Sequence, residues 1–240
     1  MKLKLARLLQ SQGMGTRRHC IAQIKAGEVS VNGSVCVNPD ALFDTTDLQF
    51  SIAGETWLYR EKVYLALHKP AGYECSHQPM HHPSVFTLLP APLRERGVQC
   101  VGRLDQDTTG LLLLTDDGGF IHRATTPARH IAKVYEVTCK YPVDDAQIAR
   151  LLAGVTLRDT PDAIAALTCT PIAPDTVKLT IAEGKYHQVK RMLAAVGNRV
   201  MALHRVAIGN YELPRDLLPG AWRWMNEDDL KRVETNGGGT

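Results

Sequence analysis

A carboxylate suited to nucleophilic or proton-transfer chemistry stands at Asp105, two residues after Arg103. The loop from Gly102 to Gly110 runs directly into Leu111-Leu112-Leu113-Leu114-Thr115, an apolar run that predicts a short buried strand. An aspartate in a connection rich in glycine and threonine can also be a surface group that merely solvates a turn. Catalytic groups are often held at the mouth of a buried strand, but for an isolated aspartate in such a connection the surface role is the commoner one.

A second candidate element is basic and helical. Apolar residues recur with the spacing i, i+3, i+4 and i+7, which predicts a helix with one buried edge that ends at Gly197. These residues are Val189, Met192, Leu193 and Val196. Lys185, Lys190 and Arg191 lie on or beside the exposed side. Taken alone, such a helix is more often a solvated basic face than a catalytic element.

A third piece is Lys133-Val134-Tyr135, at the start of a segment that alternates with period two through Thr138. Alternation puts Lys133 and Tyr135 on one face of a strand, so a cation and an aromatic ring can meet the same pocket. From the residues alone, Tyr135 is equally well explained as a core tyrosine.

The first 27 residues carry basic side chains and no acid, although the net charge of the 240-residue chain is only +3. A polyanion is the natural partner of such a segment, and solvated helix faces are the alternative. The basic residues are Lys2, Lys4, Arg7, Arg17, Arg18 and Lys25.

The positions of caps and turns predict two domains, residues 1–58 and 59–240. In the first, leucines with helical spacing precede a helix capped by Thr16, and a hairpin turns at Asn32-Gly33. In the second, alternating segments at 63–67, 133–138 and 176–181 predict strands, and Asp144 with Gln147 predicts a capping box. With only two or three helices expected there, we predict an α+β domain with a mixed, mostly antiparallel sheet.

Other features exclude whole classes of protein. No apolar run approaches the roughly 18 residues of a membrane span, so we expect a cytoplasmic protein without a membrane partner. The six cysteines form no C-x-x-C pair, which favours reduced structural thiols. His77, His81 and His82 could suggest a metal, but Pro79 and Pro83 break the helix that i,i+4 ligation needs, so no metal site is expected. The Gly237-Gly238-Gly239 tail is expected to fray.

The Gly102–Gly110 loop and the strand after it closely resemble the signature loop of the pseudouridine synthases. Tyr186-His187-Gln188-Val189-Lys190-Arg191-Met192 fits the same family, as does Lys69-Pro70-Ala71-Gly72, although His68 stands where the family usually has asparagine. The N-terminal module resembles the S4 RNA-binding domain, on Thr16-Arg17-Arg18 and the run from Ile24 to Gly33. The first helix of that domain commonly begins Arg-Leu-Asp-Lys, whereas this chain has Lys2-Leu3-Lys4-Leu5.

This resemblance implies that Asp105 is the catalytic residue, that Lys190 pairs with it, and that Tyr135 stacks on the target base. It implies that Arg103 occupies the place of the flipped base, and that neither a metal nor an organic cofactor takes part. Whether Asp105 attacks C1′ of the sugar, adds to C6 of the uracil or removes a sugar proton stays open. The expected RNA-binding residues are Arg103, Arg17, Arg18, Lys25, Lys69, Lys133, Lys185, His187, Gln188 and Arg191.

Within the family, the segment around His187 and Ala194-Ala195-Val196-Gly197-Asn198 with Leu203-His204-Arg205 fits the small-ribosomal-subunit type best. The implied partner is 16S ribosomal RNA in an assembling small subunit, modified by a monomer. A large-subunit 23S enzyme is the nearer alternative. A non-catalytic S4-type RNA-binding or ribosome-assembly protein is the alternative from another class, but such a protein is expected to have lost Asp105, Tyr135 or Lys190.

Overall fold

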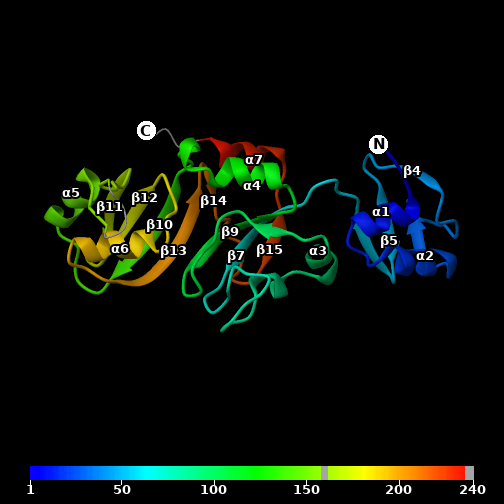
Figure 1. Cartoon of the computed structure of the whole chain (residues 1–240), viewed down its shortest axis with the longest axis horizontal. Helices are drawn as coiled ribbons and strands as arrows, with labels where there is room; N and C mark the ends of the chain where they lie inside the picture. Colours follow the sequence, from blue (N-terminus) through cyan, green and yellow to red (C-terminus); the bar gives the residue numbers. More distant parts are fainter. Residues whose placement is uncertain (158–161, 236–240) are drawn as a thin grey trace. The chain divides into compact units, whose positions relative to one another are not determined.

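The computed structural model describes residues 1–157 and 162–235, and the chain divides into two compact units (Figure 1). Unit 1 comprises Met1–Val63 and the returning segment Leu89–Val98, and unit 2 comprises the rest of the chain. The tail predicted to fray, Gly237 to Gly239, lies outside the described residues. Within the described ranges, no helix combines the length and the apolar character needed to cross a bilayer.

Unit 1 consists of two helices, short strands and the returning helix. Its elements are β1 (Lys2–Lys4), α1 (Leu5–Ser11), α2 (Arg17–Lys25), β2 (Val29–Val31), β3 (Ser34–Val35), β4 (Leu42–Asp44), β5 (Gln49–Ile52), β6 (Glu55–Leu58) and α3 (Ala91–Glu95). Strands β3, β2, β5 and β6 form one antiparallel sheet in that order, and β1 pairs with β4.

Local chemistry explains the main elements of unit 1. The Thr16 side chain accepts a hydrogen bond from the His19 backbone N–H at 3.3 Å, which confirms the predicted cap of α2. Asn32 and Gly33 both have positive φ, at 48° and 83°, as a tight hairpin between β2 and β3 requires. The faces of α1, α2 and the sheet meet in one core that includes Leu8, Ile24 and Phe50.

The segment Leu89–Val98 belongs to unit 1 although unit 2 residues flank it on both sides. Arg96 donates to the Gln12 side chain and to the Arg60 carbonyl, both at 2.9 Å. Because these bonds span 84 and 36 residues of sequence, no local pattern predicts them.

Unit 2 is organised around one nine-stranded sheet, with the order β11-β12-β10-β13-β9-β7-β15 and with β14 and β8 paired to β13 and β9 (Figure 1). Its strands are β7 (Tyr64–Lys69), β8 (Gln99–Cys100), β9 (Thr109–Thr115), β10 (Lys133–Cys139), β11 (Thr168–Ala173), β12 (Thr176–Ile181), β13 (Val200–Ile208), β14 (Tyr211–Glu212) and β15 (Trp222–Trp224). Apart from β13 with β9, the described strand pairs of this sheet are antiparallel. The predicted α+β class with a mixed, mostly antiparallel sheet is confirmed.

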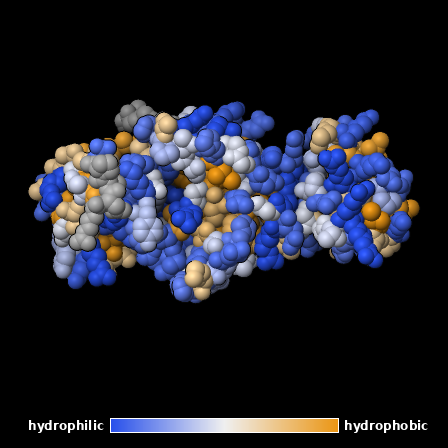
Figure 2. All heavy atoms as spheres, viewed as in Figure 1, coloured by the Kyte–Doolittle hydropathy of each residue, from blue (hydrophilic) through white to orange (hydrophobic). Residues whose placement is uncertain are grey.

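Four α-helices occur in the described part of unit 2, more than the two or three that the sequence indicated. They are α4 (Gly118–Thr125), α5 (Asp145–Ala153), α6 (Gln188–Ala195) and α7 (Glu227–Glu234), with 3-10 turns at Val85–Leu88 and Pro127–Arg129. Helices α4 and α7 run side by side and pack Phe120 and Val233 against the β7–β9 part of the sheet (Figure 1). Hydrophilic residues predominate on the face seen in Figure 2, as is typical of packed domains whose apolar side chains are turned inward.

Strands β9 and β13 form the seam between the two halves of this sheet. They pair at only two positions, His204 with Thr109 and Arg205 with Gly110. Gly110 has φ +102°, and a Cβ there would lie within 3.0 Å of three backbone atoms of Arg205. The Arg205 guanidinium adds a bond across the seam, since its Nε donates to the Leu111 carbonyl at 2.8 Å. The close approach of the strands therefore requires glycine at this position.

We predict that Gly110→Ala lowers the free energy of unfolding by roughly 2 kcal/mol or more, because the methyl group meets backbone atoms and the left-handed conformation disfavours alanine. Gly118→Ala is the matched control: Gly118 opens α4 without positive φ, and a methyl group there would meet no atom of the described residues within 4 Å. That variant should be neutral or more stable by up to about 1 kcal/mol. Equilibrium unfolding in denaturant measures both, and equal stability of the two variants would contradict the steric argument.

Candidate active site

The loop that carries Asp105 is supported from beneath by Lys69, the last residue of β7. The Lys69 ammonium donates to the carbonyls of Pro70, Gln106 and Thr108 at 3.1, 3.2 and 2.8 Å. It is fully buried, and burial lowers its pKa. The loop is closed by a turn in which the Thr108 N–H donates to the Asp105 carbonyl at 3.1 Å.

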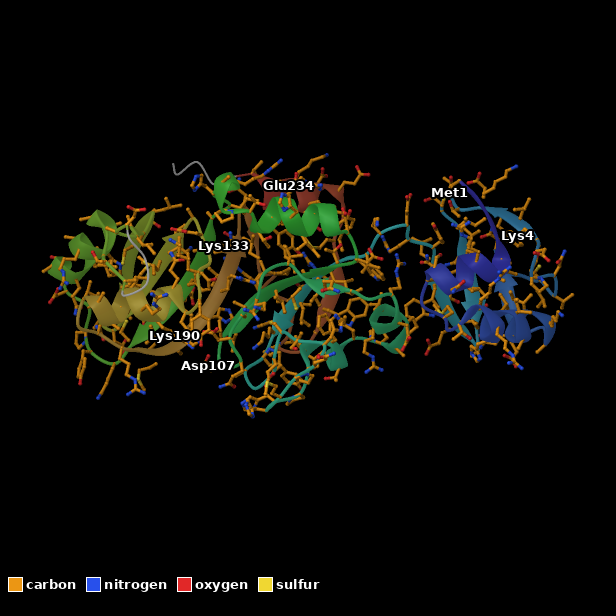
Figure 3. All side chains as sticks on the ribbon, in the orientation of Figure 1. Met1, Lys4, Asp107, Lys133, Lys190 and Glu234 are labelled. Atoms are coloured by element: carbon orange, nitrogen blue, oxygen red, sulfur yellow. The ribbon has the colours of Figure 1, made fainter. Side chains whose placement is uncertain are left out.

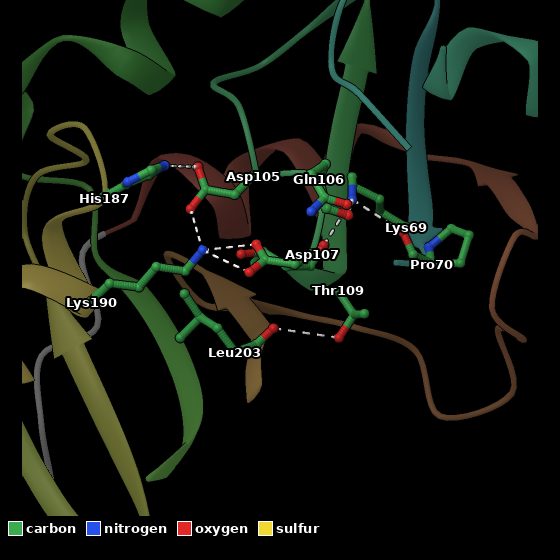
Figure 4. A network of polar contacts seen from close by, with 10 residues as sticks. Lys69, Pro70, Asp105, Gln106, Asp107, Thr109, His187, Lys190 and Leu203 are labelled. Atoms are coloured by element: carbon green, nitrogen blue, oxygen red, sulfur yellow. Dashed lines mark hydrogen bonds and ion pairs between the residues drawn. The ribbon is translucent and has the colours of Figure 1, made fainter. Parts of the chain in front are cut away.

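Asp105 lies close to the Lys190 ammonium and to the His187 imidazole (Figure 4). Its Oδ2 is 3.0 Å from Lys190 Nζ, and its Oδ1 is 3.4 Å from His187 Nε2. The carboxylate side chain is 29 % exposed, so it is held in place yet can be reached from outside. An anchored, accessible carboxylate can act as a nucleophile or as a base.

Lys190 reaches the loop from the first turn of α6. His187 precedes the helix in the left-handed conformation, with φ 49°, and Gln188 Oε1 accepts from the Lys185 N–H at 2.9 Å. These contacts fix the turn that directs the Lys190 side chain toward the loop. Partial burial lowers the pKa of Lys190, but the hydrogen bonds and charges of Asp107 and Asp105 outweigh that effect and raise it.

The sequence did not indicate a second carboxylate on the same ammonium. Lys190 Nζ lies 2.8 and 3.0 Å from the two oxygens of Asp107, and Figure 3 shows the two side chains together. Partial burial raises the pKa of Asp107, but the hydrogen bond and charge of Lys190 prevail and lower it. Lys190 is therefore shared between two acids, of which Asp107 is the more exposed, at 56 % against 29 %. The spacing Asp-x-Asp was the available signal for this arrangement.

Asp105 opens onto a cavity of about 130 Å³. Tyr135 and Lys133 of β10 line it, as predicted from their alternation, and Arg205 lies opposite Tyr135 on β13. Tyr135 is only 7 % exposed, and its hydroxyl accepts from Arg205 Nη1 at 3.5 Å. Arg205, which sequence reasoning did not single out as a site residue, thus links the cavity wall to the seam.

Lys133 carries an electrostatically unfavourable charge in this cavity. Burial, followed by the charge of Arg205, lowers its pKa to about 8. Its Nζ donates to the Ile131 carbonyl at 2.8 Å. Lys133 is therefore cationic at neutral pH and loses its charge on moderately alkaline titration.

The structure corrects the expectation that Lys69 contacts RNA. Its side chain has no exposure, and three backbone carbonyls accept its hydrogen bonds, so it supports the loop instead. Gln188 is also buried, and its amide is engaged with the Lys185 N–H and faces the Met192 sulfur at 3.9 Å. Gln188 also lines the cavity, so its RNA contact stays a prediction beside this supporting role.

The other predicted residues lie nearer the surface. Arg103 is exposed at the cavity, and Lys185 pairs with Glu183 at 3.2 Å. Arg191 Nη1 donates to the Tyr186 carbonyl at 3.2 Å. The Tyr186 ring is 72 % exposed and stacks on His187 at 3.8 Å, a solvent-facing aromatic surface beside the site that we did not predict.

In unit 1, Arg17 and Lys25 line a separate basic hollow with Lys4 and Arg7, and Arg18 is exposed on the same helix as Arg17 and Lys25.

The described residues contain no group of three or more His, Cys, Asp or Glu side chains that could hold a metal ion.

The sequence and the structure were compared with known proteins, and both comparisons identify the same family. The model of the RNA pseudouridylate synthase family matches residues 63–195, which include Asp105, Tyr135 and Lys190. A crystal structure of a pseudouridylate synthase is 33 % identical, covers 96 % of this chain and 99 % of its own, and superposes with a TM-score of 0.69.

Curated relatives point in the same direction. The ribosomal small subunit pseudouridine synthase A of Yersinia pestis is 39 % identical over 232 residues, or 93 % of this chain and 95 % of that protein. The protein of the same name in Escherichia coli strain K12 is 45 % identical over 170 residues, or 71 % of this chain and 73 % of its own length.

We predict that the Lys133 amine reacts with acetic anhydride half-maximally near pH 8, because only the neutral amine is nucleophilic and the pKa of Lys133 is lowered to about 8. Competitive labelling across pH with peptide mapping measures the midpoint, with the exposed Lys178 of β12 as internal reference. Arg205→Met should move the midpoint upward, since it removes one cause of the shift. A midpoint near the ordinary lysine value of about 10.4 would refute the assignment.

Proposed function

The chain belongs to the RNA pseudouridylate synthase family, and from this premise we propose that it isomerises one uridine of 16S ribosomal RNA to pseudouridine. The observation that carries the proposal is the Asp105–Lys190 ion pair, 3.0 Å long, at a small cavity lined by Tyr135. The names of the relatives in Yersinia pestis and Escherichia coli support the small-subunit substrate.

Asp105 is the reacting group of this proposal. Isomerisation breaks the N1–C1′ bond, turns the base over and joins C5 to C1′, with no redox change and no group left over. A carboxylate paired with Lys190 can attack C1′, add to C6 of the uracil or take a sugar proton, and each route needs it. None of the three requires a metal or an organic cofactor.

The cavity supports a flipped base as the substrate. Its volume of about 130 Å³ is below the range of drug-sized pockets and suits a single base. A base stacked in RNA must be turned out to reach Asp105, at a cost of a few kcal/mol. Stacking on Tyr135 offsets part of this cost, at about 1–3 kcal/mol per base, and the exposed Arg103 can take the vacated place.

Binding of the surrounding RNA is assigned to the cationic surfaces. In unit 1, Lys4, Arg7, Arg17 and Lys25 line one hollow, where Asp40 is the one acid among the described lining residues. Phosphate contacts of this kind give salt-sensitive affinity with little dependence on sequence. In this proposal, unit 1 acts like an S4 domain and holds a structured region of the RNA.

The enzyme is proposed to act in the cytoplasm as a monomer. Because the structured region of the RNA can be reached before the small subunit closes, the proposed partner is the assembling particle.

We predict that Asp105→Asn lowers turnover by roughly a thousandfold or more, because the amide keeps the size of the side chain but cannot act as a nucleophile or base. Asp107→Asn is the matched control, since it removes the other acid on Lys190 and leaves the Asp105 pair; its turnover should stay within about tenfold of wild type. Tritium released from C5-labelled uridine in RNA measures turnover. RNA affinity measured beside it should stay within a few-fold for both variants. Measurable turnover by Asp105→Asn, with deamidation excluded, would remove the catalytic assignment.

The choice of substrate is tested by offering the enzyme unmodified 16S and 23S ribosomal RNA in parallel and mapping the product. We expect modification of 16S RNA, with partly assembled small subunits or protein-bound 16S fragments as better substrates than mature subunits or naked RNA. Modification of 23S RNA alone would assign the chain to large-subunit enzymes. Binding without modification of either RNA would favour the non-catalytic S4-type alternative.

A further inference from the structure

Two thiols lie together next to the Asp105 loop, and the proposed reaction uses neither. Cys75 follows β7, and Cys100 ends β8, where it pairs with Leu114 of β9. The two thiols hydrogen-bond to each other, and both side chains are partly exposed. The Leu104 N–H, one residue before Asp105, donates to Cys75 Sγ at 3.5 Å.

The buried charge of Lys69 gives this pair an electrostatic role. Lys69 is fully buried, its hydrogen-bond partners are neutral carbonyls, and it forms no ion pair with a carboxylate of the described ranges. A buried cation without a counter-charge is costly. Burial lowers the pKa of Lys69, and among the groups that oppose this effect Cys75 acts most strongly, ahead of Asp107 and Asp105.

The same contacts decide which sulfur holds the proton. The hydrogen bond from Cys100 lowers the pKa of Cys75 to about 6 against the opposing effect of burial, with further help from the Leu104 N–H and the charges of Lys69 and Arg205. The hydrogen bond to Cys75, together with burial, raises the pKa of Cys100. The proton shared by the two sulfurs therefore stays on Cys100, and Cys75 is the sulfur that becomes the thiolate.

We propose that Cys75 is a reactive thiolate and a site of covalent modification by electrophiles and peroxides, with Cys100 as the thiol that resolves its oxidised form. The geometry that supports this is the thiol pair itself, the Leu104 N–H aimed at Cys75 and the buried Lys69 ammonium beneath the same loop. A thiolate, not a thiol, is the nucleophile in such reactions.

The oxidation balances with hydrogen peroxide as the oxidant. The Cys75 sulfur attacks one peroxide oxygen, the O–O bond breaks, and hydroxide leaves and takes up a proton to give water and a sulfenic acid. The Cys100 sulfur then attacks the Cys75 sulfur, the S–O bond breaks, and the departing hydroxide combines with the Cys100 proton as a second water. The product is a Cys75–Cys100 disulfide, which removes the negative charge that faces Lys69.

Alkylation of the full-length wild-type protein tests the thiolate. With limiting iodoacetamide at pH 7 and peptide mapping, Cys75 should react about tenfold faster than Cys36, because an ordinary cysteine is only a few per cent thiolate at that pH. Cys36 is the internal control, since it is also partly exposed but its thiol donates to the Asn38 carbonyl at 3.7 Å. The rate at Cys75 should fall as pH drops through about 6. If Cys75 reacts no faster than Cys36, the proposal is wrong.

Two variants of Cys100 separate its role as a hydrogen-bond donor from its role as a resolving thiol. Dilute hydrogen peroxide should give a Cys75–Cys100 disulfide in the wild type, reversible by dithiothreitol. Cys100→Ser keeps a donor, so Cys75 should still oxidise but stop at a sulfenic acid that dimedone traps. Cys100→Ala removes the donor and should slow alkylation of Cys75 several-fold at pH 7. Oxidation of Cys36 with Cys75 unchanged, or equal alkylation rates in the two variants, would overturn the proposal.

Discussion

The close parallel approach of β9 and β13 is the constraint on which the site depends. Only two residue pairs join these strands, and Gly110 permits the contact because it places no side chain against the Arg205 backbone. The Asp105 loop enters β9 at this point, and β13 follows the helix that carries Lys190. The seam therefore fixes both halves of the ion pair, although they lie 85 residues apart in sequence. Arg205 reinforces it through Leu111 and extends it to the Tyr135 hydroxyl.

The three lysines of the site, Lys190, Lys133 and Lys69, have different surroundings, and these surroundings indicate a different role for each. Lys190 is shared by two carboxylates, so its charge is matched and its pKa is raised. Lys133 has no carboxylate partner among the described residues, and burial together with the charge of Arg205 lowers its pKa to about 8. Lys69 is enclosed by carbonyls beneath the loop and organises its backbone. In the proposed function, an anionic RNA approaching the cavity meets a partly buried lysine whose charge no carboxylate of the described residues neutralises, while Asp105 keeps Lys190 as its counter-ion.

Local chemistry in the sequence was enough to predict much of the fold. The Thr16 cap, the Asn32-Gly33 hairpin, the capping box of Asp144 with Gln147 and the edge of α6 all depend on residues a few positions apart, and the structure confirms them. Helix α4 was missed because it begins with Gly118 and Gly119, which usually mark a turn, and α7 because Leu230 and Val233 alone are too few to show a helical period. Other features depend on contacts between segments far apart in sequence, which hydrophobic periodicity and capping residues cannot predict. These features are the burial of Lys69, the thiol pair and the return of Leu89–Val98 to unit 1. Asp105 and Lys190 were paired through family resemblance, since spacing alone could not join them.

His68, which stands where the family usually has asparagine, has a defined place beside the same seam. Its Nδ1 is 2.7 Å from the Leu217 carbonyl, and its ring meets His204 of β13 edge to face, with centroids 5.5 Å apart. His204 Nδ1 lies 2.8 Å from the Thr109 hydroxyl. Burial, followed by the charge of His68, lowers the pKa of His204, so that ring is neutral at pH 7. An uncharged His204 can pack against His68 and still bind Thr109, and this contact links β7, β13 and β9 where the Asp105 loop begins its strand.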